Sequence, residues 1–275
     1  MGNYRAQDFD LLREAAASAS KLALSFWGRS LASERKADGS AVSEADRAVD
    51  ALLASTLRKA RPDYGWLSEE SPEPFDRLTA RRVFIVDPID GTRSFLRGGD
   101  DWTVAISIAE DHAPAIAVIT NPVRAEVFEA RAGAGAFMNG RRIFTSSQAK
   151  LSGASFAAGS SFAHGKRRLP WPNAVPIAAN SSLYRLALVA SGRADASFSL
   201  KPKSEWDIAA GALLVSEAGG KITSPSGEPL KFNSASGKVP GFVAAALELH
   251  EILIEHLSSG SGAGMRRIAE QGVRS

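Results

Sequence analysis

Hydrophobic side chains recur at helical spacing in two stretches near the start of the chain. Residues 8–27 place an apolar side chain every three or four positions, which predicts one long helix that ends at Gly28. A second helix is predicted to begin at Ser43 and to continue until Arg61 and Pro62 stop it. The apolar face of each helix is expected to be buried.

Strand-like patterns fill the next part of the chain. Residues 64–70 predict a short strand, and Val83-Phe84-Ile85-Val86 predicts a buried strand that Pro88 should end. Three further strands, with turn residues between them, predict an antiparallel meander over residues 102–109, 115–120 and 126–130. The glycine-rich residues 133–140 lack the Lys-Ser/Thr ending of a phosphate loop, so we interpret them as a tight hairpin.

From about residue 150 the pattern changes to strands that alternate with helices. The predicted strands are 154–158, 196–200, 221–223, 230–232 and 242–246, and the predicted helices are 181–190, 207–218 and 248–257. This alternation favours an α/β second half. We therefore expect an N-terminal α+β unit over residues 1–148, a smaller α/β unit over 149–258, and a disordered tail over 259–275 that is rich in Ser and Gly and then basic.

Composition narrows the class of protein. A length of 275 residues, 44% hydrophobic and 23% charged, is ordinary for a soluble globular protein. The formal net charge of +3 does not favour a nucleic-acid or membrane partner. The absence of cysteine excludes disulfides and thiolate metal sites. The start has no signal-peptide core, and no apolar run approaches the ~20 residues of a membrane span, so a cytoplasmic protein is expected.

Carboxylates stand at the ends of several predicted elements. Glu69, Asp87, Asp90 and Asp207 occupy such positions, where a turn or helix-capping role is the ordinary alternative. Two charges about 4 Å apart repel by about 4 kcal/mol at an effective dielectric of 20, so four converging carboxylates need protons or cations. All-oxygen ligation favours Mg²⁺ or Mn²⁺ over Zn²⁺, and two such ions suit in-line displacement at phosphorus.

Three blocks of sequence carry a resemblance to a known family. These are Leu67-Ser68-Glu69-Glu70, Asp87-Pro88-Ile89-Asp90-Gly91-Thr92, and Trp206-Asp207-Ile208-Ala209-Ala210-Gly211 running on to Glu217-Ala218-Gly219-Gly220. In this order and spacing they resemble the signatures of the inositol monophosphatase family, the Mg²⁺-dependent, lithium-sensitive phosphomonoesterases. The resemblance covers about residues 8–258. It implies a layered αβαβα sandwich, with N-terminal helices on an antiparallel sheet and a smaller C-terminal α/β unit.

The resemblance also implies roles for individual residues. Glu69, Asp87 and the Ile89 carbonyl would hold one ion, and Asp87, Asp90 and Asp207 another, within a site for two or three Mg²⁺ ions, with Mn²⁺ as the alternative. The N–H groups of Gly91 and Thr92 would bind the phosphate. Asp46, otherwise a helix-cap residue, would hydrogen-bond Thr92 and, with Glu69, help to deprotonate the attacking water. Lys36 matches a basic loop residue, and no covalent phosphoenzyme is expected.

The identity of the phosphate ester rests on fewer residues. Asp195 matches a substrate-side position and would bind a hydroxyl group, with a turn role as the alternative. Inositol-preferring members carry a glutamate where this chain has Leu200, whereas Lys201 and Lys203 could bind a second phosphate. Arg93-Ser94-Phe95 resembles the nucleotidase branch of the family. The preferred interpretation is a 3′(2′),5′-bisphosphate nucleotidase acting on 3′-phosphoadenosine 5′-phosphate.

Other functions stay open at this stage. Inositol-1-monophosphatase is the alternative enzyme, followed by phosphatases for histidinol phosphate or sugar bisphosphates. A different class is a regulatory member of the family that binds RNA or protein through the basic tail, which lacks aromatic residues between its charges. A homodimer is an expectation of the resemblance alone.

Overall fold

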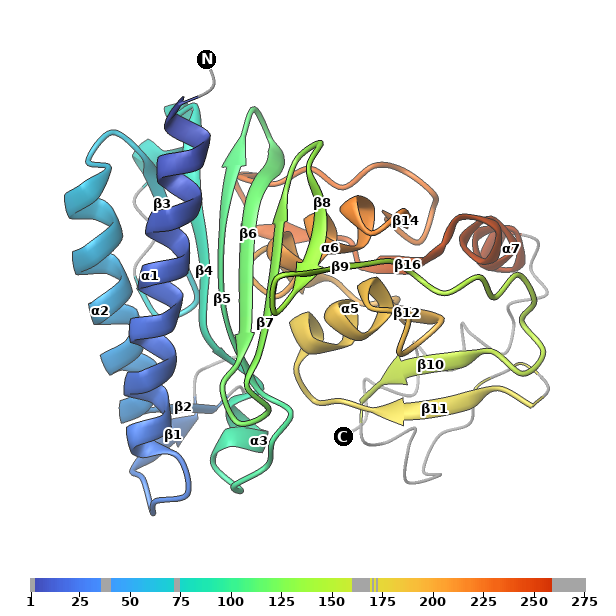
Figure 1. The fold of residues 1–275 in the computed structure, drawn as a ribbon, viewed down its shortest axis with the longest axis horizontal. Helices are drawn as coiled ribbons and strands as arrows, with labels where there is room; N and C mark the ends of the chain where they lie inside the picture. The colour runs from blue at the N-terminus through green and yellow to red at the C-terminus, as the bar shows by residue number, and fades with distance from the viewer. Residues whose placement is uncertain are drawn as a thin grey trace.

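The computed structural model describes residues 3–35, 41–71, 75–159, 169, 171 and 173–258. These residues form stacked layers of helices and sheets (Figure 1). Two N-terminal helices cover one face of a seven-stranded sheet, two further helices separate that sheet from a five-stranded one, and the last helix lies on the outside. The predicted mixed α/β class is confirmed. Within the described residues, none of the helices is long and apolar enough to span a membrane.

The outer layer is formed by α1 (Asn3–Phe26) and α2 (Glu44–Ala60), close to the predicted ranges. Their apolar faces bury Leu12 and Leu53 against residues of the sheet such as Phe84. A short hairpin of β1 (Ser33–Arg35) and β2 (Ala41–Ser43) leads into α2. The start of α2 is capped, because the Ser43 N–H donates to the Asp46 carboxylate at 2.8 Å.

The seven strands of the large sheet lie in the order β3-β4-β5-β6-β7-β8-β9. Their bounds are β3 Gly65–Ser68, β4 Arg82–Asp90, β5 Thr103–Glu110, β6 Ala113–Asn121, β7 Glu126–Arg131, β8 Gly135–Met138 and β9 Arg141–Ile143. The meander β5-β6-β7 and the hairpin after it are antiparallel as predicted. The sheet is nevertheless mixed, because β3 and β4 are parallel. A crossover that includes a 3₁₀ helix (Phe75–Thr79) connects them.

The expectation that Pro88 ends its strand is wrong. Strand β4 continues through Pro88 to Asp90. Its register with β5 shifts between Asp87 and Asp90, which marks an irregularity in the ladder. The last β4 residue paired with β3 is Val86, so Pro88 has no β3 partner that would need its missing N–H. The irregularity delivers two aspartates to the same end of the sheet.

The inner helices and the second sheet come from the C-terminal part of the chain. Helices α5 (Ser182–Ala190) and α6 (Ala209–Glu217) pack against the large sheet, and α7 (Leu247–Ser258) lies on the other side of the small one. The small sheet has the order β11-β10-β12-β16-β14. Its strands are β11 Val175–Ala178, β10 Ser155–Ala158, β12 Ala196–Ser199, β16 Phe242–Ala246 and β14 Gly220–Thr223.

Two predictions for this part need correction. Residues 230–232 do not form a strand. The Phe232 N–H instead donates to the His112 carbonyl, in the turn after β5, at 3.0 Å. This segment is therefore held by isolated hydrogen bonds and not by strand pairing. The helix expected over 207–218 begins only at Ala209, and its N-cap position is Ile208. Asp207 is therefore not the cap of α6, which leaves its carboxylate available for another role.

Candidate active site

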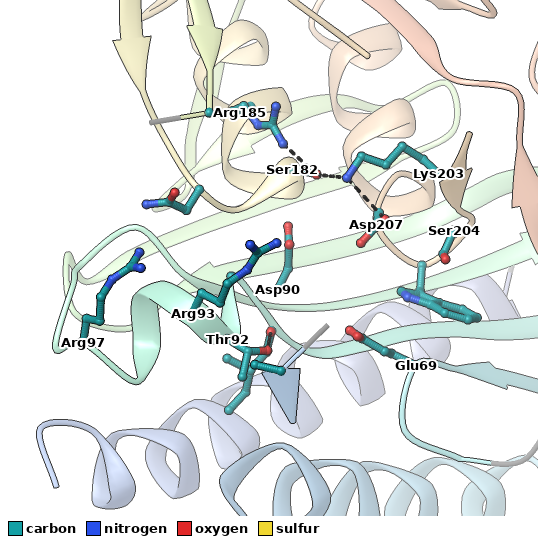
Figure 2. Close-up of a pocket in the computed structure, with 16 residues that line it drawn as sticks. Glu69, Asp90, Thr92, Arg93, Arg97, Ser182, Arg185, Lys203, Ser204 and Asp207 are labelled. Atoms are coloured by element: carbon teal, nitrogen blue, oxygen red, sulfur yellow. Dashed lines mark hydrogen bonds and ion pairs between the residues drawn. The ribbon is translucent and has the colours of Figure 1, made fainter. Parts of the chain in front are cut away.

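A cavity of about 720 Å³ lies where the end of β4 meets the helices of the C-terminal part. Its walls come from the turn after β4 and α3 (Thr92–Phe95), from the start of α5, and from the segment between β13 (Lys203–Ser204) and α6. Figure 2 shows acidic side chains at one end of this cavity and arginines toward the other. We refer to Glu69, Asp90 and Asp207 of the lining, with the buried Asp87 beside them, as the acidic end, and to Arg93, Arg97 and Arg185 as the basic end.

The acidic end brings together carboxylates that are far apart in sequence. One oxygen from each of Asp87, Asp90 and Asp207 lies within 4.8 Å of the others. Glu69, at the end of β3, lines the same cavity. The convergence proposed from the sequence is therefore present for these three aspartates, with Glu69 beside them.

Asp87 is the carboxylate of this group with the least favourable surroundings for a negative charge. It is 1% exposed, and among the described residues neither of its side-chain oxygens has a hydrogen-bond partner. Burial, followed by the charges of Glu69, Asp90 and Asp207, raises the pKa of Asp87 well above its ordinary value. A buried carboxylate without donors is unfavourable unless it is protonated or binds a cation.

Asp90 is held more firmly. Its Oδ2 atom accepts hydrogen bonds of 2.6 Å from the Ser181 hydroxyl and from the Leu183 N–H at the start of α5. Burial and the neighbouring Asp207 raise the pKa of Asp90 to about 6, although these two donors and Lys203 oppose the shift. Asp90 thus connects the end of the large sheet to an inner helix.

The turn after Asp90 connects the acidic cluster to the capped start of α2. The Thr92 hydroxyl donates to Asp46 Oδ1 at 2.9 Å, while Asp46 Oδ2 accepts from Ser43. Asp46 therefore has both roles considered from the sequence, helix capping and bonding to Thr92. Burial raises the pKa of Asp46, and the bonds from Ser43 and Thr92 oppose that rise. Gly91 has a φ of 95°, a conformation that suits glycine.

The basic end consists of three guanidinium groups from two neighbouring segments of the cavity wall. Arg93 and Arg97 are exposed on and just after α3, and Arg185 projects from α5 (Figure 2). Within the part of the chain that the structure describes, no carboxylate forms an ion pair with any of them. By contrast, Arg61 and Arg193 are paired with acidic residues. Burial lowers the pKa of Arg185, which the charges of Asp90 and Asp207 oppose.

The sequence did not identify Arg97 or Arg185 as site residues. Arg185 follows a helix start in an otherwise apolar segment, Ser182-Leu183-Tyr184-Arg185-Leu186. A lone arginine inside such a segment was a usable signal, because a charged side chain is rarely buried without a partner or a ligand. Arg97 carries no comparable signal, since it lies among exposed loop residues.

The expected substrate residues are only partly brought together. Lys203 lines the cavity, with its Nζ atom 3.6 Å from Asp207 Oδ2. Lys201 is exposed and does not belong to the lining. Leu200 is partly buried against the apolar cluster under α7, and Lys36 lies outside the described residues.

Asp195 also lies away from the described cavity lining. Its Oδ2 atom accepts from both the N–H and the hydroxyl of Ser155, each at 2.7 Å. These bonds join β10 to the residue before β12. The local structural role, considered as the alternative from the sequence, matches the contacts of Asp195, whereas the substrate role does not.

Taken together, the layers and the acidic end define an α/β protein with converging carboxylates in a cavity at the end of its large sheet. The model of the inositol monophosphatase family matches residues 6–261, and the chain belongs to this family.

Similar proteins carry more than one kind of name. Over 234 residues the chain is 34% identical to "Nus factor SuhB" of Xylella fastidiosa, which covers 80% of this chain and 82% of that protein. It is 36% identical over 204 residues to "Inositol-1-monophosphatase" of Rhizobium meliloti, covering 70% and 76%. Among solved structures, extragenic suppressor protein suhB from Bartonella henselae superposes with a TM-score of 0.80 at 30% identity, covering 91% of this chain and 98% of that one.

Proposed function

We propose that the chain is a divalent-cation-dependent phosphomonoesterase that acts in the cavity described above. The observation that carries this proposal is Asp87, a buried carboxylate whose two oxygens have no partner among the described residues, placed beside Asp90 and Asp207. The membership of the phosphatase family supports the type of reaction. Ordinary structural roles do not account for Asp87, because it neither caps a helix nor accepts a bond from a turn.

The residues of the acidic end fit a hard divalent cation. The donors are carboxylates and, as the resemblance implies, the backbone carbonyl of Ile89, a residue that lines the cavity. Such a donor set favours Mg²⁺, with Mn²⁺ as the alternative. Glu69, Asp87 and Ile89 would hold one ion, and Asp87, Asp90 and Asp207 another, as the family resemblance implies. Bound there, the ions would acidify a water molecule and stabilise the leaving oxygen.

Residues of the chain itself prepare the proton transfer. The Thr92 hydroxyl already donates to Asp46, so its oxygen lone pairs remain available to accept a proton from the attacking water. As the water oxygen attacks phosphorus, the bond from phosphorus to the ester oxygen breaks, and the departing alkoxide takes a proton from solvent water. The proton of the attacking water passes to Thr92 Oγ1, and the Thr92 proton passes to Asp46 Oδ1. The raised pKa of Asp46 favours that transfer. Glu69 lines the same cavity and would provide a second carboxylate for that water, and the N–H groups of Gly91 and Thr92 would bind the phosphate.

The two ends of the cavity indicate what kind of ester it takes. A phosphate held at the acidic end leaves the rest of the substrate facing Arg93, Arg97 and Arg185. Guanidinium groups bind phosphate through paired, charge-assisted hydrogen bonds. We therefore propose a substrate with a second anionic group, and 3′-phosphoadenosine 5′-phosphate is the candidate. In this proposal the arginines bind the second phosphate, the role that the sequence analysis gave to Lys201 and Lys203.

Inositol 1-phosphate is the second candidate substrate. The relative from Rhizobium meliloti carries the name of an inositol-1-monophosphatase at 36% identity. Leu200, however, puts an apolar and partly buried side chain where the resemblance expects a hydroxyl-binding glutamate. Loss of such a polar contact removes the hydrogen bonding that gives strong discrimination among substrates.

A substrate panel with Asp87→Asn tests the proposed function. We would measure phosphate release with Mg²⁺ from 3′-phosphoadenosine 5′-phosphate, inositol 1-phosphate, histidinol phosphate and fructose 1,6-bisphosphate. We expect phosphate release to be fastest from 3′-phosphoadenosine 5′-phosphate. Asp87→Asn should lower release more than about a hundredfold, because it removes a charged ligand. Asp63→Asn, a change of an exposed aspartate outside the cavity, is the matched control.

Each result has a distinct meaning. Equal activity in EDTA and Mg²⁺, or full activity of Asp87→Asn, would refute metal-dependent catalysis. Preference for inositol 1-phosphate would retain the phosphatase and replace the substrate. Release from no ester would favour the regulatory, binding role that the sequence analysis left open. Inhibition of the active enzyme by Li⁺ is a further expectation of the resemblance.

A further inference from the structure

Lys203 is a cation built into the acidic end of the cavity. It lies on β13, which pairs with β15 (Lys238–Val239) as a two-stranded sheet, so its backbone is held in place. The ammonium group lies 3.6 Å from Asp207 Oδ2, and the two side chains are only 27% and 21% exposed. It therefore contacts one of the three aspartates whose oxygens converge.

A second contact fixes the direction of this side chain. The Lys203 ammonium donates to the Ser182 hydroxyl at 3.0 Å, and Ser182 is buried at the start of α5 (Figure 2). The same hydroxyl oxygen accepts from Arg185 Nη2 at 2.9 Å. The chain Arg185, Ser182, Lys203 and Asp207 thus leads from the basic end to the acidic end. Lys203 points toward a carboxylate, whereas no carboxylate of the described residues forms an ion pair with Arg185.

We propose that Lys203 is an internal counter-cation that offsets the charge of Asp90 and Asp207 in the metal-free protein and weakens the binding of the ion that uses Asp207. This inference rests on the proposed function, since it assumes that the acidic end binds divalent cations. An ammonium group near Asp207 Oδ2 competes for that oxygen and repels an incoming cation. A lysine suits this role, because its flexible stem lets the charge withdraw when an ion binds.

Two consequences follow that a substrate-binding lysine would not share. Removal of the Lys203 charge should tighten binding of the weaker ion, since repulsion is lost. It should also lower the stability of the metal-free protein, because fewer positive charges then face the carboxylates. A lysine that only contacts substrate would change neither quantity.

The experiment compares Lys203→Met with Lys203→Arg and Lys238→Met in the full chain. Lys238 is an exposed lysine of the same two-stranded sheet and serves as the matched control. Mn²⁺ binding is measured by calorimetry, and melting temperature is measured in EDTA and in saturating Mn²⁺. For Lys203→Met we expect the dissociation constant of the weakest Mn²⁺ step to fall about three- to tenfold. Its metal-free melting temperature should fall, and its gain on adding Mn²⁺ should rise.

Lys203→Arg should stay close to the wild type, because it retains the charge. The counter-cation role is overturned if Lys203→Met binds Mn²⁺ as the wild type does or more weakly. An equal shift in Lys238→Met would also overturn it, since the effect would then be one of general surface charge. A wild-type chain that binds no Mn²⁺ would refute the metal site of the proposed function, a result distinct from an unchanged Lys203→Met.

Discussion

Two aspartates show how the surroundings of a carboxylate decide its role. Asp195 is partly buried, which acts to raise its pKa, but bonds from Ser146 and Ser155 prevail and lower that pKa. Asp87 has no such donors, so burial and neighbouring carboxylates raise its pKa instead. The first side chain is satisfied and serves the fold. The second has the surroundings expected of a metal ligand, which is why the candidate site is assigned to Asp87 and its neighbours.

Replacement of Arg185 tests substrate recognition separately from catalysis. Arg185→Met should lower kcat/KM for 3′-phosphoadenosine 5′-phosphate about 10- to 100-fold, because one charge-assisted contact to the second phosphate is lost. Hydrolysis of 3′-AMP, which lacks that phosphate, should change less than about threefold. Steady-state kinetics on both esters, with the exposed Arg29→Met as control, measure the difference. Equal losses on both esters would contradict a role for Arg185 in binding the second anion.

At the scale of elements, periodic patterns were the most informative part of the sequence. The spacing of apolar residues predicted α1, α2, α5 and α7 to within a few residues, because each buries one continuous face. Rules based on single residues failed where the neighbouring strands decided the outcome, as they did for Pro88. Proline stops a strand only if its N–H is needed, and beyond Val86 strand β3 no longer pairs with β4.

Some residues of the candidate site could be identified from the sequence and others could not. Asp87, Asp90 and Asp207 were identified from short motifs, and the structure brings their oxygens together. Arg185 belongs to no such motif, and its place in the cavity depends on how α5 packs between the two sheets. Asp195 had a family-like position, yet its bonds to Ser155 follow from a strand pairing that the sequence did not reveal.

The contact between α5 and α6 offers a prediction about an element. Gly211 of α6 approaches Leu186 of α5 so closely that an added Cβ atom would lie 2.5 Å from Leu186 Cδ1 and 2.6 Å from Leu186 Cβ. Gly211→Ala should therefore destabilise the fold by about 1–3 kcal/mol through overpacking, measured by urea unfolding in Mg²⁺. The Gly211→Ala/Leu186→Ala double variant should lose less stability than the sum of the losses of the two single variants. Strict additivity would show that the two side chains do not compete for space.

For the whole molecule, the cavity depends on both sheets and the helices between them. Asp90 ends a strand of the large sheet and bonds the start of α5, while Asp207 lies before α6. Global unfolding therefore destroys the site, and any group that titrates on unfolding changes the pH range over which the site exists. His250, far along the chain on α7, is such a group. It is 1% exposed, and its Nε2 atom lies 2.9 Å from Thr223 Oγ1.

Burial, together with the charge of Lys221, lowers the pKa of His250 from 6.5 to about 4. Because the folded pKa is depressed, its contribution to stability is complete above pH 6.5, falls progressively as the pH drops below 6.5, and is lost once the pH has passed through about 4. The loss amounts to at most about 3 kcal/mol. We expect metal-free wild type to lose stability relative to His250→Asn between pH 7 and 4.5, as measured by urea unfolding. The exposed His256→Gln on the same helix should follow the wild type, and a constant difference between wild type and His250→Asn would refute the prediction.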